Sequence, residues 1–319
     1  MSEDCKGKIV VALGGNALQR KGGETTAEAQ LEVVRQTCRH LARIEYSGYE
    51  TCIVHGNGPQ VGRILLASET AASVTPAMPF DVCGAMSQGY IGYHLQLAMK
   101  EALHGLGKGY IPVVTLITQV LVDAGDPGFT NPTKPIGKFY TEEEARALTV
   151  EKGYVMKEDA GRGWRRVVAS PLPKKIVEAE TIKRLWDSTI LITCGGGGIP
   201  CILNEQGNYV GVDAVIDKDY AAELLAEEVD ADVLMILTEV EKVCLNYGKP
   251  DQEEISAMTV EQALKYVEEG HFAPGSMLPK VMAGIKFANS GRHKKAIITS
   301  LDKAIEALEG RTGTTICAY

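Results

Sequence analysis

The chain has 319 residues, of which 33 are Lys or Arg and 41 are Asp or Glu, so its formal net charge is −8. This balance argues against a nucleic-acid-binding surface, and the 45% apolar content predicts a sizeable core. The longest mostly apolar run, residues 111–122, is shorter than the roughly 20 residues of a membrane span. The N-terminal MSEDCKGK has no apolar leader region. None of the eight cysteines forms a CxxC pair, so reduced thiols in the cytosol are expected.

Strands and helices alternate along most of the chain, as judged from apolar spacing and capping residues. In chain order, the pattern predicts a strand at 8–13, a helix from Thr25–Thr26 to Gly48, a strand at 51–54, a helix at 84–104, a strand at 113–122, a helix at 174–186, a strand at 190–193, a helix at 218–228, a strand at 233–237, a helix at 259–269, a helix opening within 275–280, a strand at 296–299 and a last apolar run at 314–318. The 84–104 helix has apolar residues on more than one face, which suggests contact with the core on one face and a partner chain on the other.

One stretch, from Asp123 to about Ser170, breaks the alternation. It contains three prolines and several glycines, but short apolar runs recur inside it at 154–156 and 167–169. We interpret it as an inserted excursion rather than a linker. The alternation on either side predicts an α/β protein with a mostly parallel sheet that is covered on both faces.

Three of the predicted strands end in glycine-rich turns, at 14–15, 56–58 and 195–198. Ligands of parallel sheets bind beyond the carboxyl ends of the strands. The backbone N–H groups of such turns form cradles for anions, and a further helix start at Gly275–Ser276 adds another. Together they suggest a ligand with several phosphoryl oxygens, such as a nucleotide with a second phosphorylated molecule.

Several common chemistries lack their motifs. There is no GxxxxGK[ST], the 56–62 cluster is GxGxxxG rather than GxGxxG, and HRD, DFG and HExxH are absent. Ser87 is a near miss to a GxSxG nucleophile, but no strand precedes it. The cations expected for an anionic ligand are Lys134, Lys218 and Lys280. Lys218 lies between two acids, so by position alone a surface ion pair at a helix start is the plainer interpretation.

Seven ordered segments are more specific than any single turn. They are Val10–Leu18, His55–Gly62, Asn131–Gly137, Cys194–Pro200, Asp217–Asp219, Leu237–Val240 and Gly275–Lys280. Together they resemble the carbamate kinases of the amino-acid-kinase superfamily, and the resemblance runs over nearly the whole chain. It favours a functional role for Lys218 over the surface ion pair.

The resemblance implies a single domain over 1–319, a three-layer α/β/α sandwich with a mostly parallel open sheet. An N-terminal lobe, 1–210, would hold carbamate or carbamoyl phosphate, with 123–170 as a protruding flap subdomain. A C-terminal lobe, 211–319, would bind the nucleotide. The implied protein is a cytoplasmic homodimer without nucleic-acid or membrane partners.

The implied reaction is reversible phosphoryl transfer between carbamoyl phosphate and ADP. It uses Mg²⁺ and gives ATP and carbamate, which decomposes to ammonia and CO₂. ATP formation as the last step of arginine catabolism is the expected direction.

Site residues follow from the same resemblance. Lys218 and Lys280 would contact the transferred phosphoryl group, Asp219 would orient them, and Lys134 would reach the substrate from the flap. The substrate cradle would comprise Gly14, Gly15, Asn16, Gly56, Asn57, Gly58, Gly195, Gly196 and Gly197. The nucleotide would meet Thr238, Val243, Tyr247, Ala273, Gly275, Ser276 and Met277. No protein residue is assigned as a metal ligand.

Two positions depart from wider patterns. Many amino-acid kinases have Lys where this chain has Ala12, two residues before the first glycine pair, and carbamate kinases likewise lack it. This argues against acetylglutamate, aspartate or uridylate kinase. Many relatives have Tyr where this chain has Cys244, which is either a small buried residue or a reactive thiol at the adenosine pocket rim. The remaining alternatives are a kinase for another small acid, a nucleotide sensor without catalysis, and a plain anion-binding protein.

Overall fold

The computed structural model describes residues 5–20, 22–159 and 161–318. At its centre is an eight-stranded sheet. Its strands are β1 (Gly7–Leu13), β2 (Tyr49–His55), β3 (Val113–Thr115), β9 (Ile190–Thr193), β12 (Val233–Thr238), β15 (Ala257–Thr259), β16 (Lys295–Ser300) and β17 (Thr314–Cys317). They run in the order β15–β17–β16–β12–β1–β2–β9–β3, and the β16–β17 pair alone is antiparallel. The mostly parallel sheet predicted from the sequence is therefore confirmed.

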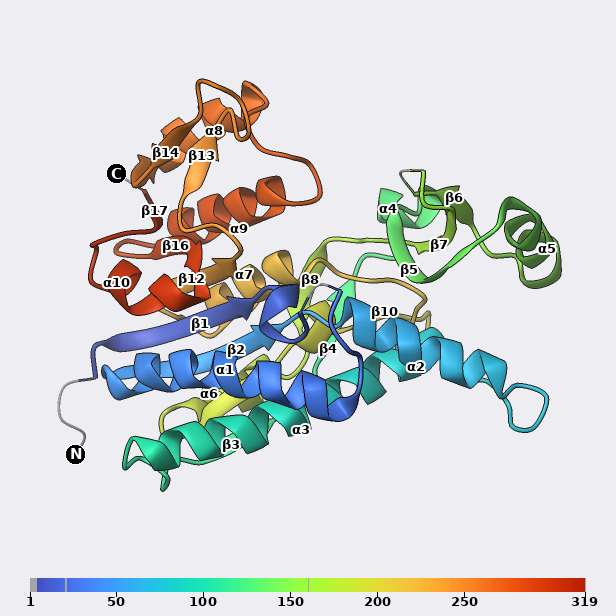
Figure 1. Ribbon diagram of the computed structural model, residues 1–319, viewed down its shortest axis with the longest axis horizontal. Coiled ribbons are helices and arrows are strands. Elements are labelled where there is room, and N and C mark those ends of the chain that lie inside the picture. Colours follow the sequence, from blue (N-terminus) through green and yellow to red (C-terminus); the bar gives the residue numbers. More distant parts are fainter. Residues whose placement is uncertain (1–4, 21, 160, 319) are drawn as a thin grey trace.

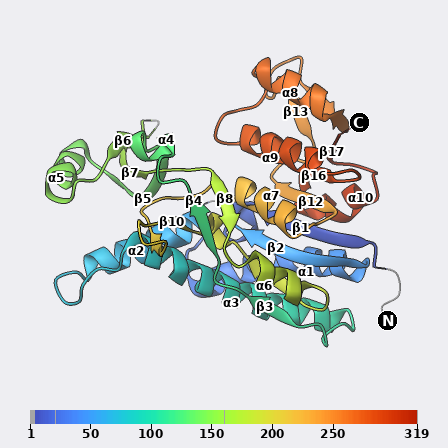
Figure 2. The same ribbon diagram turned by 180° about the vertical axis from the view of Figure 1, so that it is seen from behind.

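Helices cover both faces of this sheet (Figures 1 and 2). One face carries α1 (Ala27–Tyr46), α3 (Phe80–Gly105) and α10 (Ala304–Leu308), and the other carries α6 (Ala179–Trp186), α7 (Lys218–Glu228) and α9 (Met277–Asn289). Alternation along β1 explains the two cores. Val10 and Ala12 face α6, α7 and α9, whereas Val11 and Leu13 face α1 and α3, and all four are fully buried. The result is the three-layer α/β/α sandwich that the resemblance implied.

A second sheet lies beside the first. It consists of β4 (Gln119–Val122), β8 (Pro173–Ile176), β10 (Ile199–Leu203) and β11 (Tyr209–Gly211), in the order β11–β10–β4–β8. The strand predicted at 113–122 is therefore wrong as one element, because its halves join different sheets. The helix predicted at 174–186 begins only at Ala179, since the preceding residues pair with β4. A hairpin of β13 (Val243–Leu245) and β14 (Glu253–Ile255) and the helix α8 (Val260–Glu268) complete the C-terminal part.

The excursion forms a small layer of its own. Its elements are α4 (Pro127–Thr130), β5 (Lys134–Tyr140), α5 (Glu142–Lys152), β6 (Met156–Glu158) and β7 (Trp164–Val168). The antiparallel sheet β5–β7–β6 stands away from the main sheet, above α2 (Gly58–Thr70), a helix that the sequence analysis did not predict (Figure 1). Ile136 and Val168 pack at its base against Val61 and Phe80 of the main body.

Helix starts agree with the capping residues in the sequence. Thr26 caps α1 by accepting from Ala29 N–H at 3.2 Å. In the described part of the chain, no helix has the length and apolarity to cross a membrane. Residues 1–4, which belong to the segment on which the expectation of no leader rests, lie outside the described residues.

Candidate active site

The glycine turns meet at one edge of the sheet. β12, β1, β2 and β9 are parallel neighbours, so their carboxyl ends lie together. A methyl group on Gly14 would lie 3.0 Å from the Leu237 carbonyl oxygen, and one on Gly56 would lie 3.5 Å from Lys218 Cδ. The turn after β1 thus contacts the end of β12, and the turn after β2 contacts Lys218. The structure brings the turns together as the sequence predicts.

The turn after β9 has no room for side chains at Gly196 and Gly197. Gly196 and Gly197 have φ values of +69° and +92°, which lie in the left-handed region. A methyl group on Gly196 would lie 2.2 Å from Asn57 Nδ2, and one on Gly197 would lie 2.3 Å from the Ile216 carbonyl oxygen. Glycine is therefore required both by the backbone and by the close approach of the neighbouring turn.

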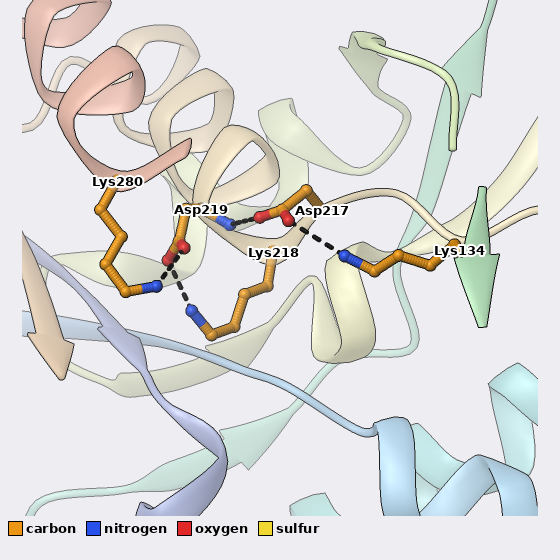
Figure 3. Close-up of polar contacts among 5 residues, drawn as sticks. All are labelled: Lys134, Asp217, Lys218, Asp219 and Lys280. Carbon is orange, nitrogen blue, oxygen red and sulfur yellow. Dashed lines mark hydrogen bonds and ion pairs between the residues drawn. The ribbon is translucent and has the colours of Figure 1, made fainter. Parts of the chain in front are cut away.

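A buried carboxylate joins two lysines at this edge (Figure 3). Asp219 Oδ1 accepts from Lys218 Nζ at 2.5 Å, and its Oδ2 accepts from Lys280 Nζ at 2.8 Å. Lys218 is the first residue of α7, and Lys280 lies in the first turn of α9. Asp217 caps α7 by accepting from Asp219 N–H at 3.0 Å, which fixes where the three consecutive side chains point.

Burial and charge set the protonation of this group. Burial raises the pKa of the Asp219 carboxyl, but the charges of Lys218 and Lys280 outweigh burial, so the pKa lies below its usual value. Burial lowers the pKa of Lys218, and contact with Asp219 offsets only part of that effect. The centre therefore combines an ionised carboxylate with lysines that can stabilise an anion.

Lys134 comes to the same place from the excursion. It begins β5, and its Nζ donates to Asp217 Oδ2 at 3.1 Å. The side chain is partly exposed, at 38%. The excursion is thus tied to the start of α7 by one ion pair, next to the partly buried Lys218 and Lys280.

A cavity of about 740 Å³ opens beside the charged centre. This volume is in the range of small-molecule sites. The predicted site residues on its wall are Gly14, Gly15, Asn16, Lys218, Thr238, Cys244, Tyr247, Ala273, Gly275, Ser276, Met277 and Lys280. The predicted residues that are not on its wall are Lys134, Asp219, Val243 and those of the turns at 56–58 and 195–197. Val243 is fully buried in β13, behind the wall that Cys244 forms.

Other wall residues were missed from the sequence. They are Ala17, Leu237, Glu239, Val240, Lys242, His271, Phe272 and Leu301. The strand-end rule could have found Leu301, which directly follows β16, and Glu239 lies within a segment already singled out. Glu239 Oε1 accepts from Asn16 Nδ2 at 2.5 Å, linking the turn after β1 to the end of β12. No local signal marks His271 or Phe272.

Cys244 is largely buried, with 8% of its surface exposed, and it lines the cavity. Its Sγ donates to the Lys242 carbonyl oxygen at 3.7 Å. Burial raises the pKa of this thiol, so little of it is thiolate at neutral pH. The residue thus combines features of both interpretations, being small and buried yet on the pocket wall.

The fold and this arrangement define a class of protein. Residues 7–300 match the family model described as the amino acid kinase family. The chain belongs to this family.

Individual relatives show to which group within this family the chain is most similar. The carbamate kinase of Clostridium perfringens is 58% identical over 316 residues, which cover 97% of this chain and 99% of that protein. A structure of the Giardia lamblia carbamate kinase bound to AMP-PNP has a TM-score of 0.92 and 45% identity, covering 98% of both chains. A second structure of that enzyme, thiocarbamoylated by disulfiram on a cysteine, has a TM-score of 0.90 and 45% identity, again covering 98% of both chains. Within the family, the chain thus groups with the carbamate kinases.

Proposed function

We propose that the chain transfers a phosphoryl group reversibly between carbamoyl phosphate and ADP, giving ATP and carbamate. The observation that carries this proposal is the Asp219 carboxylate, which holds Lys218 and Lys280 side by side at the wall of the cavity. The identity with carbamate kinases over 97% of the chain supports the choice of substrate.

Two lysines suit this chemistry. The bond between the carbamoyl oxygen and phosphorus breaks while a bond to the terminal ADP oxygen forms, and charge spreads over the three equatorial oxygens. Lys218 and Lys280 would stabilise that charge, and Asp219 keeps both ammonium groups in place before substrate arrives. No covalent intermediate is required, because positioning and electrostatic stabilisation suffice.

The glycine turns would hold the substrate end. A methyl group on Gly56 would meet Lys218, and one on Gly196 would meet Asn57, so the two turns lie next to the lysines. Their backbone N–H groups would bind the substrate there. Gly14, Gly15 and Asn16 would complete the cradle from the turn after β1. Lys134 would leave Asp217 to contact carbamoyl phosphate, closing the excursion over the site.

The cavity would hold the nucleotide. Its wall includes Thr238, Tyr247, Ala273 and Gly275–Met277, which lie on the C-terminal side of the sheet. A relative of the same fold binds AMP-PNP. Val243 would support this wall from behind rather than contact the nucleotide, since it is fully buried.

Mg²⁺ would arrive with the nucleotide. Among the described residues, no group of three or more His, Cys, Asp or Glu side chains is placed to hold a metal ion. Mg²⁺ in phosphoryl-transfer sites is bound by substrate phosphates, waters and only one or two carboxylates, so the residues present fit. Glu239 is the one carboxylate among the described residues of the cavity wall, and it would hold the ion. The ion would neutralise phosphate charge.

The proposal also covers the oligomeric state of the protein and the place of its reaction in the cell. The long α3 leaves Val82, Met86, Tyr93 and Leu97 exposed, and their spacing puts them on one face. This face would form a homodimer, which light scattering would detect as twice the 34.3 kDa chain mass.

The enzyme would work in the cytoplasm and form ATP at the end of arginine catabolism. ATP formation is the favoured direction, since carbamoyl phosphate has a higher phosphoryl-transfer potential than ATP.

A coupled assay tests the reaction. Purified protein is mixed with ADP, Mg²⁺ and fresh carbamoyl phosphate, and ATP is measured through hexokinase. Wild type should form ATP, and Lys218→Ala and Lys280→Ala should lose about 10²–10³ in kcat each. Lys286→Ala is the matched control, because Lys286 lies on the same helix as Lys280 but pairs with Glu223. Folded wild type that forms no ATP would refute the proposal.

A further inference from the structure

Two adjacent polar residues lie buried in the first half of α3, where apolar side chains would be expected. Ser87 is 0% exposed and Gln88 is 1% exposed. Ser87 is the near miss to a nucleophile motif, but its surroundings exclude that role. Its Oγ donates to the Gly84 carbonyl oxygen at 2.6 Å and accepts from Asn57 Nδ2 at 2.8 Å. The hydroxyl is therefore occupied in holding Asn57, the residue at the centre of the turn after β2.

Gln88 holds the turn after β9 in a similar way. Its Nε2 donates to the Gly195 carbonyl oxygen at 3.0 Å and to the Thr118 carbonyl oxygen at 3.1 Å. Its Oε1 accepts from Thr118 N–H at 2.8 Å. Thr118 in turn accepts from Cys194 N–H through Oγ1 at 3.0 Å. One side chain thus binds three backbone groups, and the glycine turn is fixed at two successive residues.

The two turns also contact each other. A methyl group on Gly195 would lie 2.5 Å from His55 Nε2 and 3.0 Å from Gln88 Cγ. The gap between Gly195 and the end of β2 is therefore too narrow to hold even one methyl group. The adjacent side chains of one rigid helix determine this spacing, because Ser87 holds one turn and Gln88 holds the other.

We propose that Ser87 and Gln88 are positioning residues that set the distance and orientation of the turns at 56–58 and 195–197. This inference rests on the proposed function, in which those turns hold carbamoyl phosphate. The nucleotide cavity is lined by neither turn. A displaced turn should therefore weaken binding of carbamoyl phosphate and leave binding of ADP unchanged. A merely structural role would lower stability without separating the two substrates.

Gln88→Met tests this separation. Methionine has a similar length and leaves all three backbone groups without their partner. We expect the KM for carbamoyl phosphate to rise about 10-fold, corresponding to about 1.4 kcal/mol, while the KM for ADP changes less than twofold. The matched control is Gln96→Met. Gln96 lies on the same helix and donates to the Val113 carbonyl oxygen at 3.3 Å, away from the turns. It should leave both KM values unchanged.

Ser87→Ala provides a milder second variant. It removes one hydrogen bond to Asn57, so it tests the other turn should Gln88→Met fail to fold. It should raise the KM for carbamoyl phosphate by about threefold, and Ser87→Thr, which restores an acceptor, should recover most of the loss. Equal changes in both KM values, or the same change in Gln96→Met, would overturn the positioning role. Wild type that forms no ATP would overturn the proposed function instead, and the two failures are thus distinguishable.

Discussion

Asp219→Asn removes the charge that holds Lys218 and Lys280 while nearly preserving the shape of the side chain. The Asp219 side chain is 3% exposed, so water cannot replace the lost carboxylate. Removing one partner of a buried ion pair costs about 3–5 kcal/mol, because the other charge stays buried and uncompensated. The unfolding entropy of a 319-residue chain is about 0.7 kcal/mol/K, so that cost should lower the melting temperature by roughly 5–7 °C. The kcat should fall by about 10²–10³, because the ammonium groups are no longer positioned.

The pH profile of the same variant gives a sharper test. Burial lowers the pKa of Lys218, and contact with Asp219 raises it. The substitution removes the raising contribution, so the pKa of Lys218 should fall further below its usual value. In the proposed reaction Lys218 must be protonated, so the loss of activity at alkaline pH should begin at a lower pH than in wild type.

Two measurements check this reasoning, namely thermal melting and the coupled assay from pH 6 to 10. Sulfate should raise the melting temperature of Asp219→Asn more than that of wild type, because an anion can take the place of the missing carboxylate between the lysines. Lys286→Ala again serves as the control for the alkaline limb of activity, since Lys286 lies on the same helix as Lys280 but pairs with Glu223 outside the site. An unchanged melting temperature together with an unchanged alkaline limb would refute the electrostatic account.

Three further predictions address other parts of the site. Gly197→Ala should lower the free energy of unfolding in urea far more than Gly207→Ala. Both residues have positive φ, which costs a non-glycine residue about 1–2 kcal/mol, but only at Gly197 would the added methyl group also meet a carbonyl oxygen, at 2.3 Å. Equal losses would contradict this. ADP should slow iodoacetamide labelling of Cys244, followed by peptide mass spectrometry, and the rate should rise with pH because burial raises the pKa of the thiol; exposed Cys5 is the control whose rate ADP should not change. Burial lowers the pKa of His55 from 6.5 to about 4. As the pH falls, the unfolded chain therefore takes up this proton before the folded protein does. The free energy of unfolding should drop by about 3 kcal/mol between about pH 6.5 and pH 4. His55→Asn should flatten this part of the stability profile, and a slope identical to that of wild type would count against the buried neutral imidazole.

The sheet could be predicted from sequence because its signals are local. β1 and β12 are short β-branched runs, and β1 ends at a glycine pair. The strand predicted at 113–122 failed because no local signal reveals that Gln88, about 30 residues away, binds both backbone groups of Thr118. This contact breaks the run between two sheets. The helix α2 was missed because its first residues, Gly58 and Pro59, are typical of a turn as well as of a helix start.

The Asp217–Lys218–Asp219 segment shows why the candidate site needed more than its sequence neighbourhood. By position, two acids around a lysine suggest a surface ion pair. The helix begins at Lys218, so the two carboxylates diverge: Asp217 pairs with Lys134 from the excursion, and Asp219 pairs with Lys280 from α9. These partners are 83 and 61 residues away in the chain.

The same segment shows how the buried charge is tolerated. Taking Asp219 and two lysines out of water is costly unless each charge has a partner and the remaining donors are used. The carboxylate uses both oxygens and leaves the two ammonium groups with one shared negative charge. The centre is thus short of one negative charge until an anion binds. In the proposed reaction a phosphoryl group would supply it, so the arrangement that is unfavourable by itself would become the source of affinity for phosphate.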